Sequence, residues 1–180
     1  MRYVVAIILT LHLLISNALL ADGQQLTALT PQAVTNLAAQ TDRLAMAGDI
    51  DAYSELLSDN LIVIYATSPD PDELPHEYDR AEYLAMIRES SRVYSNRLCK
   101  TTISRIDITP DGQYADVEGA VIQEGVSRAD ALVVRMTVSE KVRLRIENGG
   151  PRIVRLAGTV MKTSFEQPPP GDVLKAAPVE

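Results

Sequence analysis

Between residues 30 and 48, apolar side chains recur with the spacing of an amphipathic helix. Thr30 suits the N-cap and Pro31 the first helical position. Gly48 accepts the left-handed conformation in which many helices end. The inward face of this helix is predicted to carry Val34, Leu37, Ala38, Thr41, Leu44 and Ala45.

A second, shorter helix and a strand are predicted directly afterwards. Asp49 can cap the helix, and a polar run at 58–60 ends it. The apolar run 61–65 is too short for a helix, so we expect a buried strand there. The residues that the second helix presents to the core are expected to be Ile50, Tyr53, Leu56 and Leu57.

The segment 66–78 contains three prolines separated by acidic residues, which predicts an irregular loop long enough to act as a lid. Asp79 and Glu82 then have the spacing of a capping box, which indicates the start of a third helix. The residues expected to line this helix are Tyr83, Leu84, Ile87, Ser91 and Tyr94.

From residue 100 onward the hydrophobic period changes to two. Four strands are predicted within 101–109, 113–125, 131–146 and 152–165, with turn sequences at 109–112 and 147–150. Strands of this length must twist and bend, and Gly119 and Gly158 are the expected bend points.

This order of elements predicts an α+β fold, with three N-terminal helices on one side of a strongly bent antiparallel sheet. Helices that cover the concave face of such a sheet enclose a cone with an apolar pocket, which is a candidate site for a small molecule. We assign this domain to 30–166, and expect the proline-rich end, 167–180, to be a disordered tail.

Residues 1–21 have the layout of a signal peptide: Arg2, an apolar run, and small residues that allow cleavage after Ala18 or Ala21. The protein is therefore expected to be exported, to the periplasm or the medium, with no membrane attachment after cleavage. The competing interpretation is an uncleaved membrane anchor, because the apolar stretch approaches the roughly 20 residues that span a bilayer.

The charge of the mature chain argues against nucleic acid as a partner. The full chain has 17 basic and 24 acidic residues, and losing Arg2 leaves 16 against 24, a formal charge of −8. Basic residues alternate through 141–155, which predicts the solvated face of a hairpin; a patch for an anionic ligand is the alternative.

Cysteine and histidine usage excludes several kinds of site. Cys99 is the only cysteine, so no intrachain disulfide forms, and His76 is the only histidine outside the leader. A Cys/His zinc site cannot be built from these residues, and no cofactor or metal is expected. His76 lies in the acidic loop and is expected to be solvated rather than a general base.

The sequences LAMAGDIDAY at 44–53 and LLSDN at 56–60 resemble the opening of the NTF2-like superfamily, which includes SnoaL-like cyclases and ketosteroid isomerases. The resemblance extends over about 34–165. It implies an enolisation site built from a tyrosine on the first helix, a base after the first strand and an aspartic acid on a later strand. Those positions fall at Thr41, Tyr65 and about Ser139, so none matches.

Other polar residues can still project into the pocket. A buried acid together with Tyr65 would support a dehydratase or cyclase, with Asp42 as the candidate acid. The alternative places Asp42 and Arg43 on the solvated side of the first helix, and Arg135 and Glu140 in cross-strand pairs on the exposed sheet face. The expected ligand pocket contains Thr41, Tyr53, Tyr65, Tyr83 and Ile87.

Two functions follow from these expectations. The first is an exported domain that binds a small apolar ligand or a protein partner without catalysis, as a homodimer through the outer sheet face. The second is a periplasmic lyase or isomerase of the SnoaL type, which uses Tyr65 and Asp42 on a small hydrophobic substrate.

Overall fold

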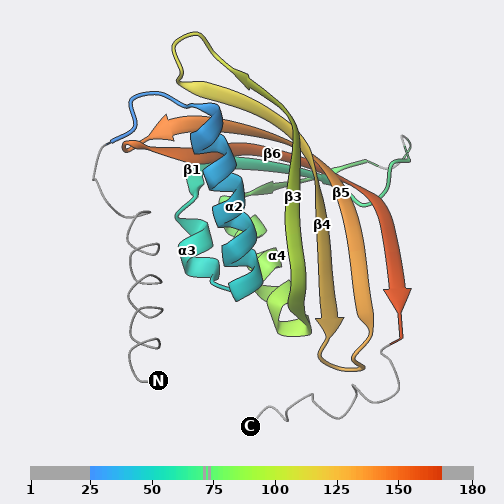
Figure 1. The fold of residues 1–180 in the computed structure, drawn as a ribbon. Helices are drawn as coiled ribbons and strands as arrows, with labels where there is room; N and C mark the ends of the chain where they lie inside the picture. Colours follow the sequence, from blue (N-terminus) through green and yellow to red (C-terminus); the bar gives the residue numbers. More distant parts are fainter. Residues whose placement is uncertain (1–24, 71, 73, 168–180) are drawn as a thin grey trace, which may run out of the picture.

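The computed structural model describes residues 25–70, 72 and 74–167, which form a curled six-stranded sheet with helices against its concave face (Figure 1). The strand order is β2-β1-β6-β5-β4-β3. The expected leader at 1–21, and the expected tail apart from Gln167, lie outside the described residues. No helix in the described ranges is both long and apolar enough to cross a membrane.

Helix α2 (Pro31–Ala47) begins and ends where the sequence predicts. The Thr30 side chain accepts a hydrogen bond from the Ala33 amide, which caps the first turn. Gly48 ends the helix in the left-handed conformation, with φ of 67°. Val34 and Leu37 are its buried residues, so the predicted inward face is the one that contacts the core.

Helix α3 (Ile50–Ser54) is shorter than expected, although Asp49 caps it by accepting from the Ala52 amide. The expectation that Leu56 and Leu57 belong to this helix was wrong. The Leu56 carbonyl accepts from the Ile153 amide, and Leu57 already begins strand β1 (Leu57–Ala66). Both leucines are buried. The chain therefore loses no apolar burial when this segment pairs with β6 instead of extending the helix.

The segment predicted to be an irregular loop contains a short strand, β2 (His76–Asp79), which pairs antiparallel with β1. Pro75 stands just before β2, a position that proline tolerates at the edge of a sheet. The expectation of a loop throughout 66–78 was therefore wrong at its end. His76 is exposed, as predicted.

Helix α4 (Arg80–Val93) has the predicted capping box, in which the Asp79 side chain accepts from the Glu82 amide and the Asp79 amide donates to the Glu82 carboxylate. Tyr94 does not continue this helix as expected but begins strand β3 (Tyr94–Ile108), which starts before the predicted residue 101. Ladder pairing of Tyr94 with Ser127 of β4 explains the early start.

Strands β3, β4 (Tyr114–Ser127), β5 (Val133–Glu147) and β6 (Gly150–Glu166) form the predicted antiparallel meander. The sheet as a whole is mixed, not antiparallel as expected, because β1 pairs parallel to β6. Helix α4 and the long meander separate these two strands in the chain, so the sequence pattern gave no local signal for their pairing.

The outer face of the sheet carries cross-strand ion pairs at the solvated hairpin predicted from its alternating basic residues. Arg143 donates two hydrogen bonds of 2.8 Å to Asp116, and Lys141 lies 3.1 Å from Glu118. These side chains are largely exposed, so each pair stabilises the sheet only slightly.

The inner face carries the core. Helices α2, α3 and α4 cover one end of the concave side, and the strands extend beyond them (Figure 1). Leu84 of α4 packs in the same apolar cluster as Val63, Leu144 and Leu156 of the sheet. Leu144 and Leu156 of this cluster also line a cavity between the helices and the sheet.

Candidate functional site

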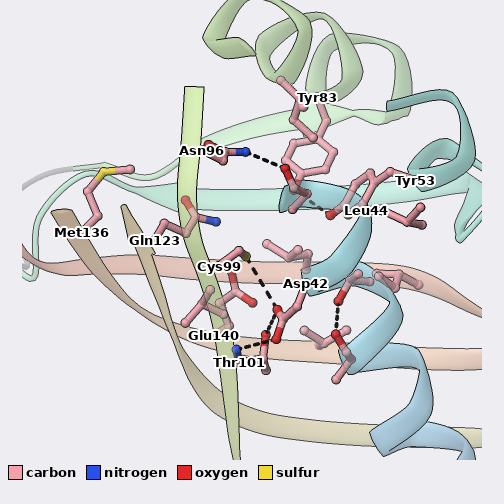
Figure 2. Close-up of a pocket in the computed structure, with 18 of the residues that line it drawn as sticks. Asp42, Leu44, Tyr53, Tyr83, Asn96, Cys99, Thr101, Gln123, Met136 and Glu140 are labelled. Atoms are coloured by element: carbon pink, nitrogen blue, oxygen red, sulfur yellow. Dashed lines mark hydrogen bonds between the residues drawn. The ribbon is translucent and has the colours of Figure 1, made fainter. Parts of the chain in front are cut away.

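A cavity of about 520 Å³ lies between the helices and the concave face of the sheet (Figure 2). Its wall is mainly apolar, with side chains from both layers that include Leu37, Ile87, Ile103, Val121, Val142 and Val160. A volume in the range of about 300–1,000 Å³ and an apolar wall with a few polar groups are typical of small-molecule sites.

Glu140 lies at the centre of the sheet wall. In the ladder, Glu140 of β5 pairs with Gly119 of β4 on one side and Gly158 of β6 on the other. Gly158 pairs in turn with Tyr65 of β1. One row across the concave face therefore places a carboxyl group between two glycines, with a tyrosine in the strand beyond.

The ring of Tyr65 lies against Gly158. A Cβ atom added at Gly158 would stand 2.9 Å from Cε2 and 3.0 Å from Cδ2 of that ring. This distance is shorter than van der Waals contact, so only glycine admits the ring in this position. Gly158, which the sequence marked as a bend point, thus has a second role in placing Tyr65 over the sheet.

The Glu140 side chain points into the cavity, and within the described residues no group donates a hydrogen bond to it. Burial, and then the negative charge of Asp42, raise the pKa of the Glu140 carboxyl group to about 7. The group therefore exchanges its proton near neutral pH. The expectation that Glu140 forms a cross-strand pair on the exposed face was wrong.

The sequence did contain a signal for the inward position of Glu140. Glu140 lies two residues from Val138 and from Val142, which both face inward. In addition, the alignment with the isomerase pattern places its acidic position at about Ser139, one residue away. Ser139 is exposed, and so is Arg135, which lies on the opposite face from Glu140 as the period of two requires.

Asp42 lies between α2 and β3 rather than on the solvated side of the helix, which corrects the alternative expectation for this residue (Figure 2). Its carboxylate accepts from the Thr101 amide at 2.8 Å, the Thr101 hydroxyl at 2.7 Å and the Cys99 thiol at 3.6 Å. Arg43 is exposed. Asp42 thus anchors α2 to β3, and its oxygen atoms already have donors.

The Cys99 thiol faces the same cavity. Burial, and then Asp42, raise the pKa of this thiol to about 12. A thiol that keeps its proton is a poor nucleophile, so Cys99 contributes a weak hydrogen-bond donor to Asp42 rather than covalent chemistry.

Two further tyrosines meet in the cavity wall. The hydroxyl groups of Tyr53 and Tyr83 lie 3.3 Å apart, so one can donate to the other and leave one proton for a ligand. Burial raises the pKa of Tyr53 to about 12 and that of Tyr83 well above its ordinary value. Burial and Glu140 likewise raise the pKa of Tyr65 to about 12, so all three phenols remain hydrogen-bond donors.

Every residue assigned to the pocket from the sequence lines the cavity: Thr41, Tyr53, Tyr65, Tyr83 and Ile87. The Thr41 hydroxyl donates to the Ala38 carbonyl of its own helix at 2.7 Å, which uses its proton within α2. Their roles in ligand binding stay predictions.

The described residues that line the cavity include no lysine, arginine or histidine. Arginines of α4 point elsewhere: Arg80 donates to the Ser54 carbonyl, and Arg88 lies 3.5 Å from Asp51 on the surface. In the described ranges, no group of three or more Cys, His, Asp and Glu side chains is arranged to hold a metal ion.

Neither known sequence families nor curated protein sequences match the chain. Solved structures do match. An NTF2-like protein from Cytophaga hutchinsonii has 13% identity and a TM-score of 0.59, covering 74% of this chain and all of that protein, 100%.

Several matches have names that refer to enzymes. A putative scytalone dehydratase from Novosphingobium aromaticivorans has 12% identity and a TM-score of 0.61, covering 76% of this chain and 87% of that protein. A ketosteroid isomerase-like protein from Erwinia carotovora atroseptica has 14% identity and a TM-score of 0.58, covering 73% of this chain and 95% of that protein. The fold that this chain shares with these structures is the NTF2-like fold.

Proposed function

We propose that this domain binds a small, predominantly apolar molecule in the cavity between α2, α3, α4 and the sheet. The observation that carries the proposal is the cavity of about 520 Å³, whose wall is mostly aliphatic. Burying apolar ligand surface there supplies about 25 cal/mol per Å² before the cost of ordering the ligand is subtracted.

Polar groups at separate points of the wall would orient such a molecule. The Tyr53–Tyr83 hydroxyl pair comes from α3 and α4, whereas Glu140 comes from the sheet. A ligand with one or two polar atoms on an apolar skeleton fits this distribution, and a strongly polar ligand would leave most of the aliphatic wall without a matched contact.

The neutral fluorescent dye Nile red tests the binding function. Ala38 of α2 lines the cavity, whereas Ala39 beside it is exposed. We expect the wild type and Ala39→Phe to bind the dye, and Ala38→Phe to bind at least about tenfold more weakly because the phenylalanine ring takes up space in the cavity that the dye needs. Circular dichroism checks that both variants fold. Equal binding by the two variants would show that the dye does not occupy the cavity.

A second candidate function is proton transfer on a neutral carbonyl compound, as in a cofactor-independent lyase or isomerase. It is favoured by Glu140, whose raised pKa near 7 suits a general base at neutral pH. Glu140 would take the proton from the carbon next to the carbonyl group, and the Tyr65 hydroxyl would donate to the oxygen that becomes negative. Asp42 is a weaker candidate than the sequence suggested, because Thr101 and Cys99 already donate to it.

Hydrogen–deuterium exchange into 2-tetralone, followed by NMR in D₂O, tests the catalytic candidate. The wild type should accelerate the exchange, Glu140→Gln should abolish the acceleration, and Tyr65→Phe should reduce it by about 10²-fold or more. Exchange at the buffer rate in the presence of wild-type protein would leave ligand binding as the function.

We also propose that the protein is exported through its leader and forms a homodimer through the outer sheet face. N-terminal sequencing of protein recovered from the cell envelope or medium should find a start after Ala18 or Ala21. Light scattering should give twice the mass of one chain at micromolar concentration. A full-length N-terminus, or a monomer, would contradict the respective proposal.

A further inference from the structure

The charges of the cavity wall are all of one sign. Its ionisable acids are Asp42, Asp49 and Glu140, and the lining residues among those described include no cationic side chain. Asp49 is exposed and caps α3. The two inner acids, Asp42 and Glu140, therefore set the electrostatic potential of the interior, which opposes the entry of an anion.

The two inner acids differ in the number of hydrogen-bond donors that contact their oxygen atoms. Three groups from Cys99 and Thr101 donate to Asp42, so its oxygen atoms have partners. Glu140 lies deep in the cavity wall with no donor from any described residue. The Glu140 side chain is half-buried and faces the open cavity, so a ligand that supplies a donor there gains a charge-assisted hydrogen bond.

The titratable groups that face Glu140 come from five of the elements packed around it. Asp42 approaches from α2, Tyr53 from α3, Tyr83 from α4, Tyr65 from β1 and Cys99 from β3. The neighbouring positions on β4 and β6 are glycines. No basic group of the described residues faces Glu140, so a counter-charge has to come from the ligand.

We infer that the cavity selects a small apolar amine, with its ammonium group at Glu140 and its apolar skeleton against the aliphatic wall. The inference rests on the ligand-binding function proposed above and specifies the chemical class of the ligand. An ammonium group donates the missing hydrogen bond and neutralises the buried carboxylate. The adjacent Tyr65 ring adds an aromatic surface, next to which cations are stabilised.

Selection of a cationic ligand by Glu140 predicts that the affinity for the amine depends on pH. Free Glu140 is largely protonated below pH 7 and must lose its proton to pair with an ammonium group. An aliphatic amine stays cationic over this range. Affinity for the amine should therefore rise roughly tenfold between about pH 6 and pH 8, as the ionised fraction of Glu140 rises. A neutral ligand gains nothing from that ionisation.

A matched bicyclic series tests the inference by isothermal titration calorimetry: 2-aminotetralin, 2-tetralol and tetralin-2-carboxylate. At pH 8 the amine should bind at least about tenfold more tightly than the alcohol, and the carboxylate weakest of the three. Glu140→Gln should weaken amine binding more than alcohol binding and should remove the pH dependence of amine binding. Asp51→Asn, which removes an exposed acid on α3, is the charge control and should behave as wild type.

Equal or tighter binding of the alcohol, or binding of the carboxylate as tight as that of the amine, would overturn the inference. It would also fail if amine binding in Glu140→Gln kept the wild-type affinity. Nile red binding separates this failure from failure of the proposed function. If the alcohol and the amine displace the dye at equal concentrations, the cavity binds ligands without charge selection. If neither the dye nor any tetralin binds, both proposals fail together.

Discussion

Glu140 and Gly158 are direct partners in the β5–β6 ladder, and the Tyr65 ring lies against Gly158 from the next strand. The missing side chain at Gly158 thus allows a buried carboxyl group and a phenol ring to share one stretch of the concave wall. This arrangement joins β1 to the distant β5–β6 hairpin and places two polar groups in a mainly apolar cavity wall.

Replacing Gly158 by alanine is expected to displace the Tyr65 ring, since the added Cβ would lie 2.9 Å from it. We expect a loss of about 1–3 kcal/mol in the free energy of unfolding, the usual cost of overpacking, measured by urea denaturation. In a Tyr65→Ala background the same substitution should cost much less, because the ring is absent.

Gly150 supplies the matched control for this prediction. It lies in the same strand, and a Cβ added there meets no atom within 4 Å. Gly150→Ala should therefore change the free energy of unfolding by no more than about 0.5 kcal/mol. Strictly additive effects of Gly158→Ala and Tyr65→Ala would refute the proposed contact.

The raised pKa of Glu140 predicts a pH dependence of stability. In the folded state this pKa is about 7, against 4.5 for an ordinary glutamate, so the folded protein holds the proton more tightly. The resulting stabilisation is present below about pH 4.5 and is lost as the pH rises to 7. Glu140→Gln should remove this decline and be more stable than wild type at pH 8, by about 1–3 kcal/mol.

Denaturation curves of both proteins between pH 4 and 8 measure this difference. Glu118→Gln, on the exposed outer face, is the control, and its curve should run parallel to that of the wild type. If the curve for Glu140→Gln also ran parallel to that of the wild type, the carboxyl group would not be buried as described.

Asp42 is the second cause of the raised pKa of Glu140. Asp42→Asn removes the charge but keeps an oxygen atom that can accept from Thr101. The pKa of Glu140 should fall in this variant and stay above 4.5, because burial is the larger cause. Carbon-13 NMR titration of the glutamate carboxyl groups measures the change, and an unaltered pKa would mean that the two acids do not interact.

Cys99 should be chemically inert in the folded protein. Burial and Asp42 raise the pKa of its thiol to about 12, so the reactive thiolate is scarce at pH 8. Ellman's reagent should react at least about a hundredfold more slowly with the native protein than with the urea-unfolded chain. Asp42→Asn should react faster than wild type while remaining folded. A native rate close to the unfolded one would place Cys99 outside the cavity wall.

Local chemistry was sufficient to predict where the helices begin and where α2 ends, whereas α3 and α4 end earlier than expected. Thr30, Asp49 and Asp79 cap the amides that the first turn of a helix leaves free, and Gly48 ends α2 in a conformation that other residues avoid. The alternation of apolar residues predicted the meander for a similar reason, since each strand must bury one face. The tyrosines of the cavity followed from the same helix and strand periods.

What the sequence by itself determined is therefore the set of helices and long strands and the apolar face of each. Only the tertiary structure decided that β1 pairs parallel to β6, which brings Tyr65 beside Gly158 and within the field of Glu140. It also decided that, among the described residues, none donates to Glu140 while three groups donate to Asp42. Such contacts depend on how distant segments pack against each other, and no local period or capping preference encodes them.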